Sequence, residues 1–190
     1  MRVVHVKESQ PREACLARLC AEVYGHQAGL APLATFAGTL GVLFRQEAAR
    51  VVALVDDAAR PVALALLVFD REGRSVELAL MTGLEEADVD APAERLVAAL
   101  AERMPLRVNA TDATQQAMFE RCGIARWLDA PGDLRIGLAP GHPPTDLADL
   151  PTSLNFDGNA VMQSFKQDRA LFDGYKTRFV RGLEAFPATL

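Results

Sequence analysis

Residues 106–124, LRVNATDATQQAMFERCGI, constrain the fold more than any other part of this sequence. Leu106 and Val108 alternate as one face of a strand. Asp112 and Gln115 have the spacing of a helix N-cap and its reciprocal cap, and Gly123 is a natural C-terminal stop. The segment therefore predicts an apolar strand, a polar turn and a short helix closed by glycine.

Hydrophobic periodicity predicts further helices and strands on both sides of this segment. Helices are expected after Ser9 and over residues 32–46 and 92–104. Strands are expected over residues 3–6, 51–55, 62–69, 76–81, 125–128 and 134–138. The strands before and after the turn at residues 70–74 are expected to form a central hairpin.

The run Met118, Phe119, Glu120-Arg121-Cys122, Gly123, Ile124 resembles the last conserved segment of the GCN5-related N-acyltransferases (GNATs). That segment is a strand and then a helix ending in an aromatic residue, three residues, a glycine and usually phenylalanine. The resemblance extends to the element order from about residue 1 to residue 138. It implies an α/β (α+β) fold with a central mixed, mostly antiparallel sheet flanked by helices, and the activity of an acyl-CoA-dependent N-acyltransferase.

The resemblance also implies which residues bind the acetyl-CoA or acyl-CoA donor. These are Met81, Thr82 and Gly83 at the splayed end of the central strand, with Asp112 and Phe119 in the last helix. Phe119 occupies the position of a tyrosine that protonates the departing thiolate in many GNATs, and a phenyl ring has no proton to give. Asp112 stands where the family often has asparagine.

The loop after the central hairpin departs furthest from the family pattern. GNATs bind the coenzyme A pyrophosphate there, on the backbone amides of a glycine-rich, usually basic loop at a helix N-terminus. Here the loop over residues 84–92 contains no glycine and carries four carboxylates: Glu85, Glu86, Asp88 and Asp90. A pair of like charges about 4 Å apart costs on the order of 4 kcal/mol at an effective dielectric constant near 20, less where water and salt screen it. The chain is therefore expected to be a divergent GNAT, in which donor binding is doubtful.

The acids of this loop also have an ordinary structural interpretation, because Asp and Glu cap free amides at a helix N-terminus. Asp90 is the expected cap. A cation site is the functional alternative, but the spacing matches no defined calcium loop, so no metal is predicted.

Glu77 lies in the predicted strand over residues 76–81, at the kind of position from which GNATs deprotonate an amine, so the resemblance implies that Glu77 is the candidate catalytic base. Strand alternation places Val76, Leu78 and Leu80 on one face and Glu77 on the other. A solvated glutamate on a strand face is the alternative interpretation.

Composition excludes several other classes of partner and location. A net charge of −5 and a pI near 5.2 argue against a nucleic acid or an anionic membrane surface. Three cysteines without metal-ligand spacing suggest buried thiols in a reduced compartment. No signal peptide or membrane span is evident, so a cytoplasmic protein is expected. His5, His26 and His142 are assigned no role.

The sequence predicts an N-acyltransferase-like domain over residues 1–138, a linker over residues 139–156 and a helical appendage over residues 157–190. Residues Val161, Phe165, Phe172, Tyr175, Phe179, Leu183 and Phe186 give this C-terminal amphipathic helix an aromatic face. Gly174 is the candidate break within it. The favoured interpretation is that the helix folds back onto its own domain, and the alternative is a partner surface, such as a homodimer interface.

Two functions remain open at this level. One is an acyl-CoA-dependent N-acyltransferase with an altered phosphate loop, acting on a small-molecule or protein amine through Glu77. The other is a non-catalytic binding or assembly module on the same fold, which would use the acidic loop and the aromatic C-terminal helix.

Overall fold

The computed structural model describes residues 1–25, 27–86 and 88–190. His26, to which the sequence assigns no role, and Ala87, in the predicted phosphate loop, lie outside the described residues. The strands are β1 (Arg2–His5), β2 (Ala49–Val55), β3 (Pro61–Phe69), β4 (Val76–Gly83), β5 (Leu106–Ala110), β6 (Arg126–Asp129) and β7 (Arg135–Leu138). The helices are α1 (Ser9–Tyr24), α2 (Ala31–Gly38), α3 (Pro92–Ala101), α4 (Ala113–Arg121), α5 (Gly158–Gln167) and α6 (Arg169–Glu184), with a π-helical turn at Thr39–Leu43 and a 3₁₀ turn at Leu147–Asp149.

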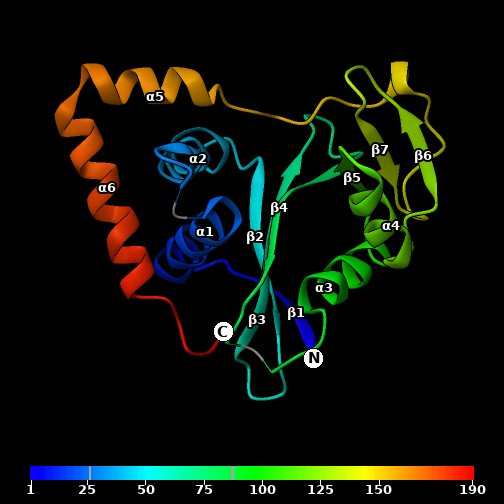
Figure 1. Ribbon diagram of the computed structural model, residues 1–190, viewed down its shortest axis with the longest axis horizontal. Coiled ribbons are helices and arrows are strands. Elements are labelled where there is room, and N and C mark those ends of the chain that lie inside the picture. The colour runs from blue at the N-terminus through cyan, green and yellow to red at the C-terminus, as the bar shows by residue number, and fades with distance from the viewer. Residues whose placement is uncertain (26, 87) are drawn as a thin grey trace.

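The described strands form one sheet in the order β1-β2-β3-β4-β5-β7-β6. The pair β4 and β5 is parallel, and the other neighbouring pairs are antiparallel. The predicted mixed, mostly antiparallel sheet is therefore confirmed. Figure 1 shows α1, α2, α5 and α6 on one side of the sheet and α3 and α4 on the other.

Two hydrophobic clusters, one on each face of the sheet, make up the core. The α1-side core contains Leu64 and Leu66 of β3, and the α3-side core contains Ala63, Ala65 and Leu67 of the same strand. Strand β3 is buried along nearly its whole length. Its continuous apolar run follows directly from burial on both faces.

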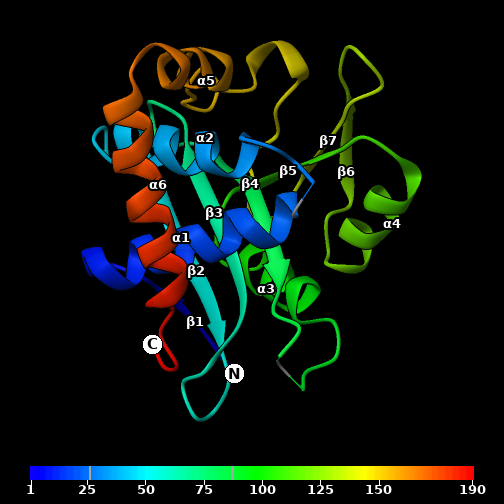
Figure 2. The ribbon, with the colours of Figure 1, turned by 60° about the vertical axis from the view of Figure 1, so that its left-hand side comes forward.

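The C-terminal helices pack against the face formed by α1 and α2, in agreement with the favoured interpretation of the aromatic face (Figure 2). The rings of Phe179 and Phe36 meet edge to face, with centroids 5.3 Å apart. At Gly182 the two backbones come so close that an added Cβ would lie 2.8 Å from the Cβ of Ala17. This tail is therefore part of the α1-side core.

The helix break predicted at Gly174 is wrong, because α6 runs through that residue. The break lies at Asp168, which ends α5 and whose carboxylate accepts a hydrogen bond from the amide of Leu171 at 2.9 Å. An aspartate that caps free amides favours a helix start, whereas a single glycine inside a helix is tolerated at modest cost.

Among the described residues no helix is long and apolar enough to cross a membrane.

Candidate functional site

The parallel strands β4 and β5 separate after a short paired stretch. They pair at Val76 with Leu106 and at Glu77 with Arg107. The remainder of β4, as far as Gly83, pairs with β3 alone among the described strands. Its other edge therefore presents backbone N–H and C=O groups to the opening between the strands, where they need water or a ligand as partner.

A β-bulge lies at the point where the strands separate. Leu78 pairs with Leu67 and Leu80 pairs with Leu66, so Ala79 is an extra residue on β4. A bulge leaves the extra residue unpaired and changes the direction of the side chains after it. Leu78 consequently belongs to the α3-side core and Leu80 packs against the α1-side core. The prediction that Val76, Leu78 and Leu80 share one face is wrong because simple alternation does not survive the bulge.

Glu77 is held by side chains from the neighbouring strand. Arg107 donates from Nε to Oε2 of Glu77 at 3.1 Å, and its Nη2 donates to the same oxygen. Asn109 donates from Nδ2 to Oε1 at 3.1 Å. The Glu77 side chain is 19% exposed and that of Arg107 is 10% exposed. Glu77 is therefore a partly buried, paired carboxylate, and the alternative of a solvated strand-face glutamate is wrong.

Arg107 and Asn109 are not among the site residues predicted from the sequence. Both alternate with Leu106 and Val108 in the strand 106–110, so the signal available was two polar residues on one strand face. Their partner could not be identified, because the parallel pairing of β5 with β4 joins residues 30 positions apart.

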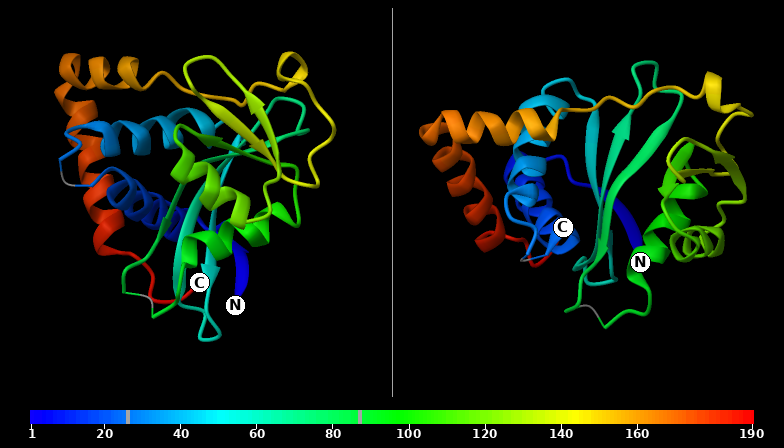
Figure 3. Two further views of the ribbon diagram at one scale, coloured as in Figure 1. Left: turned by 45° about the vertical axis from the view of Figure 1, so that its right-hand side comes forward. Right: turned by 45° about the horizontal axis from the view of Figure 1, so that its top comes forward.

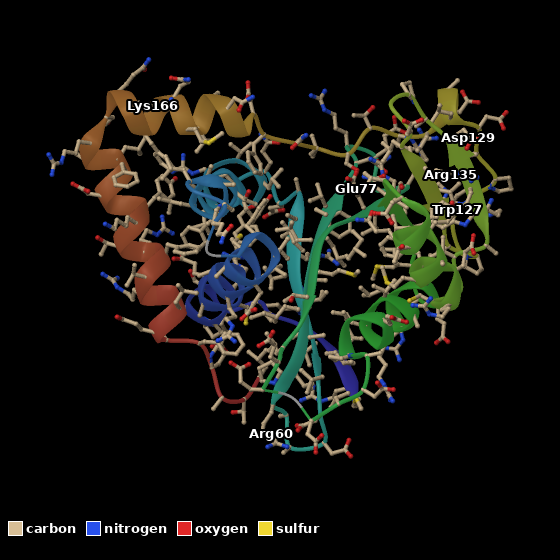
Figure 4. The ribbon with its side chains drawn as sticks, in the orientation of Figure 1. Arg60, Glu77, Trp127, Asp129, Arg135 and Lys166 are labelled. Carbon is tan, nitrogen blue, oxygen red and sulfur yellow. The ribbon has the colours of Figure 1, made fainter. Side chains whose placement is uncertain are left out.

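A cavity of about 300 Å³ adjoins Glu77 on the α1 side of the sheet. Leu43, Leu66 and Leu80 give it apolar walls, and Tyr24 and Thr35 line it from the helices. The Thr35 hydroxyl donates to the Tyr24 hydroxyl at 3.0 Å. Figure 4 shows Glu77 near the start of β4, below the chain that leads to α5.

The segment 151–156, here called the strap, forms the remaining wall of this cavity. Arg107 donates from Nη1 to the carbonyl of Pro151 at 2.7 Å. The amide of Leu154 donates to the carbonyl of Phe69 at 3.0 Å. The ring of Phe156 lies on Gly38, where an added Cβ would meet it at 2.2 Å. The strap, which Figure 3 shows crossing one end of the sheet, is thus fixed at three points along its length.

The loop between β4 and α3 does not offer the phosphate cradle of the family. The helix begins at Pro92, which has no N–H group, and the ring of Pro92 would lie 2.8 Å from a Cβ at Gly83. Ala91, in the left-handed conformation with φ of 45°, is the N-cap, and it supplies no side-chain hydrogen bond. The prediction that Asp90 caps this helix is therefore wrong, since the N-cap position falls on Ala91, directly before Pro92.

The acids of this loop are exposed, and one of them is paired. Glu86 accepts a hydrogen bond from Nη2 of Arg18 at 2.5 Å, and this bond holds the pKa of Glu86 below its usual value. Arg18 also lies over the ring of Phe186, 5.7 Å from its centroid. The described part of the loop is thus held against α1 and the C-terminal tail. A diphosphate does not fit this loop, because its exposed carboxylates would repel the phosphates and Pro92 has no backbone N–H group to donate to them.

Of the other predicted donor-site residues, Phe119 and Met81 lie on the α3 side of the sheet. Phe119 is 5% exposed within the α3-side core. Asp112 caps α4 as predicted, accepting from the amide of Gln115 at 2.8 Å, although the Gln115 side chain returns to Thr111 rather than to Asp112. Met81 packs against the same core, and the Thr82 hydroxyl donates to the carbonyl of Gly83. Met81, Thr82 and Gly83 lie along the unpaired edge of β4.

Metal ligation has no support among the described residues, where no group of three or more His, Cys, Asp or Glu side chains comes together. The buried ring of His142 is satisfied by the Ser75 hydroxyl at 3.0 Å and the Pro143 carbonyl at 2.9 Å. The cysteines are buried and free, as predicted.

Comparison with known proteins identifies the fold. No protein-family model matches the chain, and no curated protein matches it. Among solved structures, a spermidine N-acetyltransferase SpeG chimera from Vibrio cholerae and hSSAT matches with a TM-score of 0.50 at 12% identity, over 73% of this chain and 93% of that one. A GNAT-family protein from Desulfovibrio desulfuricans matches with a TM-score of 0.47 at 17% identity, over 72% and 97%. The Vibrio cholerae spermidine N-acetyltransferase in complex with CoA and spermine matches with a TM-score of 0.47 at 11% identity, over 75% and 98%. The match with a TM-score of 0.50 shows that the chain has an acetyltransferase fold, in agreement with the GNAT fold predicted from residues 106–124.

Proposed function

We propose that this protein is a divergent N-acyltransferase that transfers an acyl group from an acyl-CoA to an amine bound beside Glu77. The observation that carries the proposal is the junction of the separating strands, where the bulged Ala79, the Glu77 carboxylate and a cavity of about 300 Å³ meet. Bulges are frequent next to active sites because they free backbone groups and redirect side chains.

Glu77 has the capacity to accept one further proton donor. A carboxylate offers about four lone-pair sites, and Arg107 and Asn109 use three of them. An amine N–H can take the open site on Oε1. In the reaction, the amine nitrogen bonds to the thioester carbonyl carbon, the C–S bond breaks and the amine proton passes to Glu77. The leaving thiolate takes its proton from water, since Phe119 has none to give.

The donor would use the unpaired edge of β4 from Met81 to Gly83 for its thioester arm. Backbone groups that lack a strand partner can bind an extended ligand by hydrogen bonds, as in strand addition. Its diphosphate would have to stay in solvent, away from the exposed acids of the loop. The expected donor affinity is therefore low, and it should fall further when the loop is more negative.

The second candidate function is a binding module without acyl transfer. Pro92 packed on Gly83 and the buried phenyl ring of Phe119 favour it, because both replace groups that acyl transfer uses in the family. The aromatic face of the C-terminal helix is packed on the α1-side core, so it is not the binding surface that this alternative predicted. Under this alternative the cavity beside Glu77 binds the ligand instead, and no donor enters between β4 and β5.

Isothermal titration with acetyl-CoA at low salt distinguishes the two candidates. The double variant Glu85→Gln/Asp88→Asn removes two loop charges and leaves the Arg18–Glu86 pair intact. It should bind acetyl-CoA about fivefold more tightly than the wild type, the effect of one or two weak surface charge contacts. The control Glu102→Gln/Asp146→Asn makes the same charge change at other exposed positions and should leave binding unchanged. If neither the wild type nor the loop variant binds, the enzyme proposal fails and the binding module remains.

A further inference from the structure

We infer that the amine acceptor is a small monoamine with an apolar body, and not a polyamine. This inference rests on the proposed function, and it narrows the substrate class of the cavity beside Glu77. The structural neighbour with the highest TM-score given above is a chimera of spermidine N-acetyltransferases, whose named substrate carries several ammonium groups. The cavity of this chain has different charges.

The described side chains that line the cavity have no net charge. Glu77 and Arg107 are the charged residues among them, and they are paired with one another. A polycation needs several carboxylates, because each ammonium group that leaves water requires a partner of opposite charge. A neutral site instead favours the uncharged form of a single amine, which is also the nucleophilic form.

The hydrogen-bonding capacity of the Glu77 carboxylate indicates the same substrate class. Oε1 of Glu77 retains one open acceptor position, as counted above, so the described carboxylate can accept one amine N–H. Leu43, Leu66, Val68, Leu80 and Leu154 then present apolar surface to the rest of the ligand. Burial of the ligand's methylene groups on this surface is favourable. A second ammonium group would lack a carboxylate partner, because the other polar residues of the lining are uncharged: Tyr24, Thr35, Thr152, Ser153 and Asn155.

The strap borders the cavity in which this ligand would lie. It is anchored at Pro151, Leu154 and Phe156. The cavity has a volume of about 300 Å³. A phenylethylamine and a linear polyamine such as spermidine both fit this volume, so charge and not size distinguishes the two ligands.

The test is a calorimetric comparison of 2-phenylethylamine with spermidine, each titrated into the full chain with and without saturating coenzyme A. We expect saturable binding of 2-phenylethylamine that is at least about tenfold tighter than that of spermidine. Equal or tighter binding of spermidine overturns the inference, and so does failure of both amines to bind under either condition. Because the amines are measured by binding alone, this result is independent of whether acetyl-CoA binds, which tests the proposed function.

Asn155→Asp provides a gain-of-function test. Asn155 is an exposed cavity residue whose Oδ1 accepts from the amide of Phe156 at 2.8 Å, and aspartate can keep this bond. The added carboxylate should tighten spermidine binding by roughly two- to fivefold, the range of a partly solvated charge pair. Gln167→Glu makes the same change of an amide to a carboxylate at the exposed end of α5 and should have no effect. An equal gain in both variants would show a nonspecific charge effect and would count against the neutral cavity as the source of selectivity.

Discussion

Replacing Arg107 by methionine tests the pair that defines the candidate site. The substitution removes the Nε and Nη2 donors to Glu77 and leaves Asn109 as the donor to that carboxylate among the described residues. Breaking a buried ion pair by removing one partner costs about 3–5 kcal/mol, because an uncompensated charge remains. The side chains here are 10% and 19% exposed, so water reaches the carboxylate to some extent. We therefore expect a loss of about 3 kcal/mol, at the lower end of that range.

A double-mutant cycle separates the pair from other effects of the substitution. The double variant Arg107→Met/Glu77→Gln removes both charges, and it should lose about 2 kcal/mol less than the sum of the two single losses. The free energies come from urea denaturation at pH 7, followed by the fluorescence of Trp127, the single tryptophan of the chain. Losses that add within about 0.5 kcal/mol would refute the argument, because they would show no coupling between the two side chains.

Arg135→Met is the matched control for this cycle. Arg135 also lies in the sheet and pairs with Asp129 at 3.0 Å, but these side chains are 41% and 87% exposed. Exposed pairs contribute about 1 kcal/mol or less. The control should therefore change the free energy of unfolding by less than a third of the loss expected for Arg107→Met.

Three further predictions follow from other parts of the structure. Phe179→Ala, which removes the edge-to-face contact with Phe36, should cost about 2–3 kcal/mol; calorimetry should give a melting midpoint that does not depend on protein concentration, whereas a dependence would indicate that α6 stabilises an oligomer. Burial raises the pKa of Asp70, but hydrogen bonds from the amides of Glu72, Ser75 and Arg74 outweigh it and hold the pKa below its usual value. The stabilisation by the Asp70 carboxylate is thus present above the unfolded-state pKa of about 4 and is lost as the pH falls through the pKa of the folded state. The loss of unfolding free energy caused by Asp70→Asn should therefore shrink when denaturation is measured from pH 7 down to pH 3. A loss that stays constant with pH would contradict this. Burial raises the pKa of Cys122 to about 11, so a disulfide reagent at pH 8 should modify it far more slowly in the native protein than in urea, and equal rates would contradict the buried placement.

The strand and helix order could be predicted because it depends on local periodicity. The strand, cap and glycine of residues 106–124 appear in the structure as β5, the Asp112 cap and α4. The long apolar run at residues 62–69 becomes β3, buried on both faces. Each of these features is encoded by residues within a few positions of one another, so the sequence alone contains the signal.

The bulge at Ala79 and the cap at Ala91 could not be predicted, because each depends on a neighbouring element. The bulge is defined by the register of β4 against β3, and it reverses the face on which Leu80 lies. The cap falls on Ala91, one residue before Pro92, whose ring packs against Gly83 at the end of β4. The periodicity of the sequence encodes neither the strand register nor the position of this cap.

The sequence by itself determined the fold class, the departure of the phosphate loop and the identity of Glu77 as the candidate base. The tertiary structure alone decided what surrounds that base, because its contacts join positions far apart in the chain. Arg107 lies 30 residues from Glu77, and the Pro151 carbonyl that anchors the strap lies 44 residues from Arg107. Folding brings these groups together. Because Glu77 and Arg107 pair, the described lining of the cavity has no net charge.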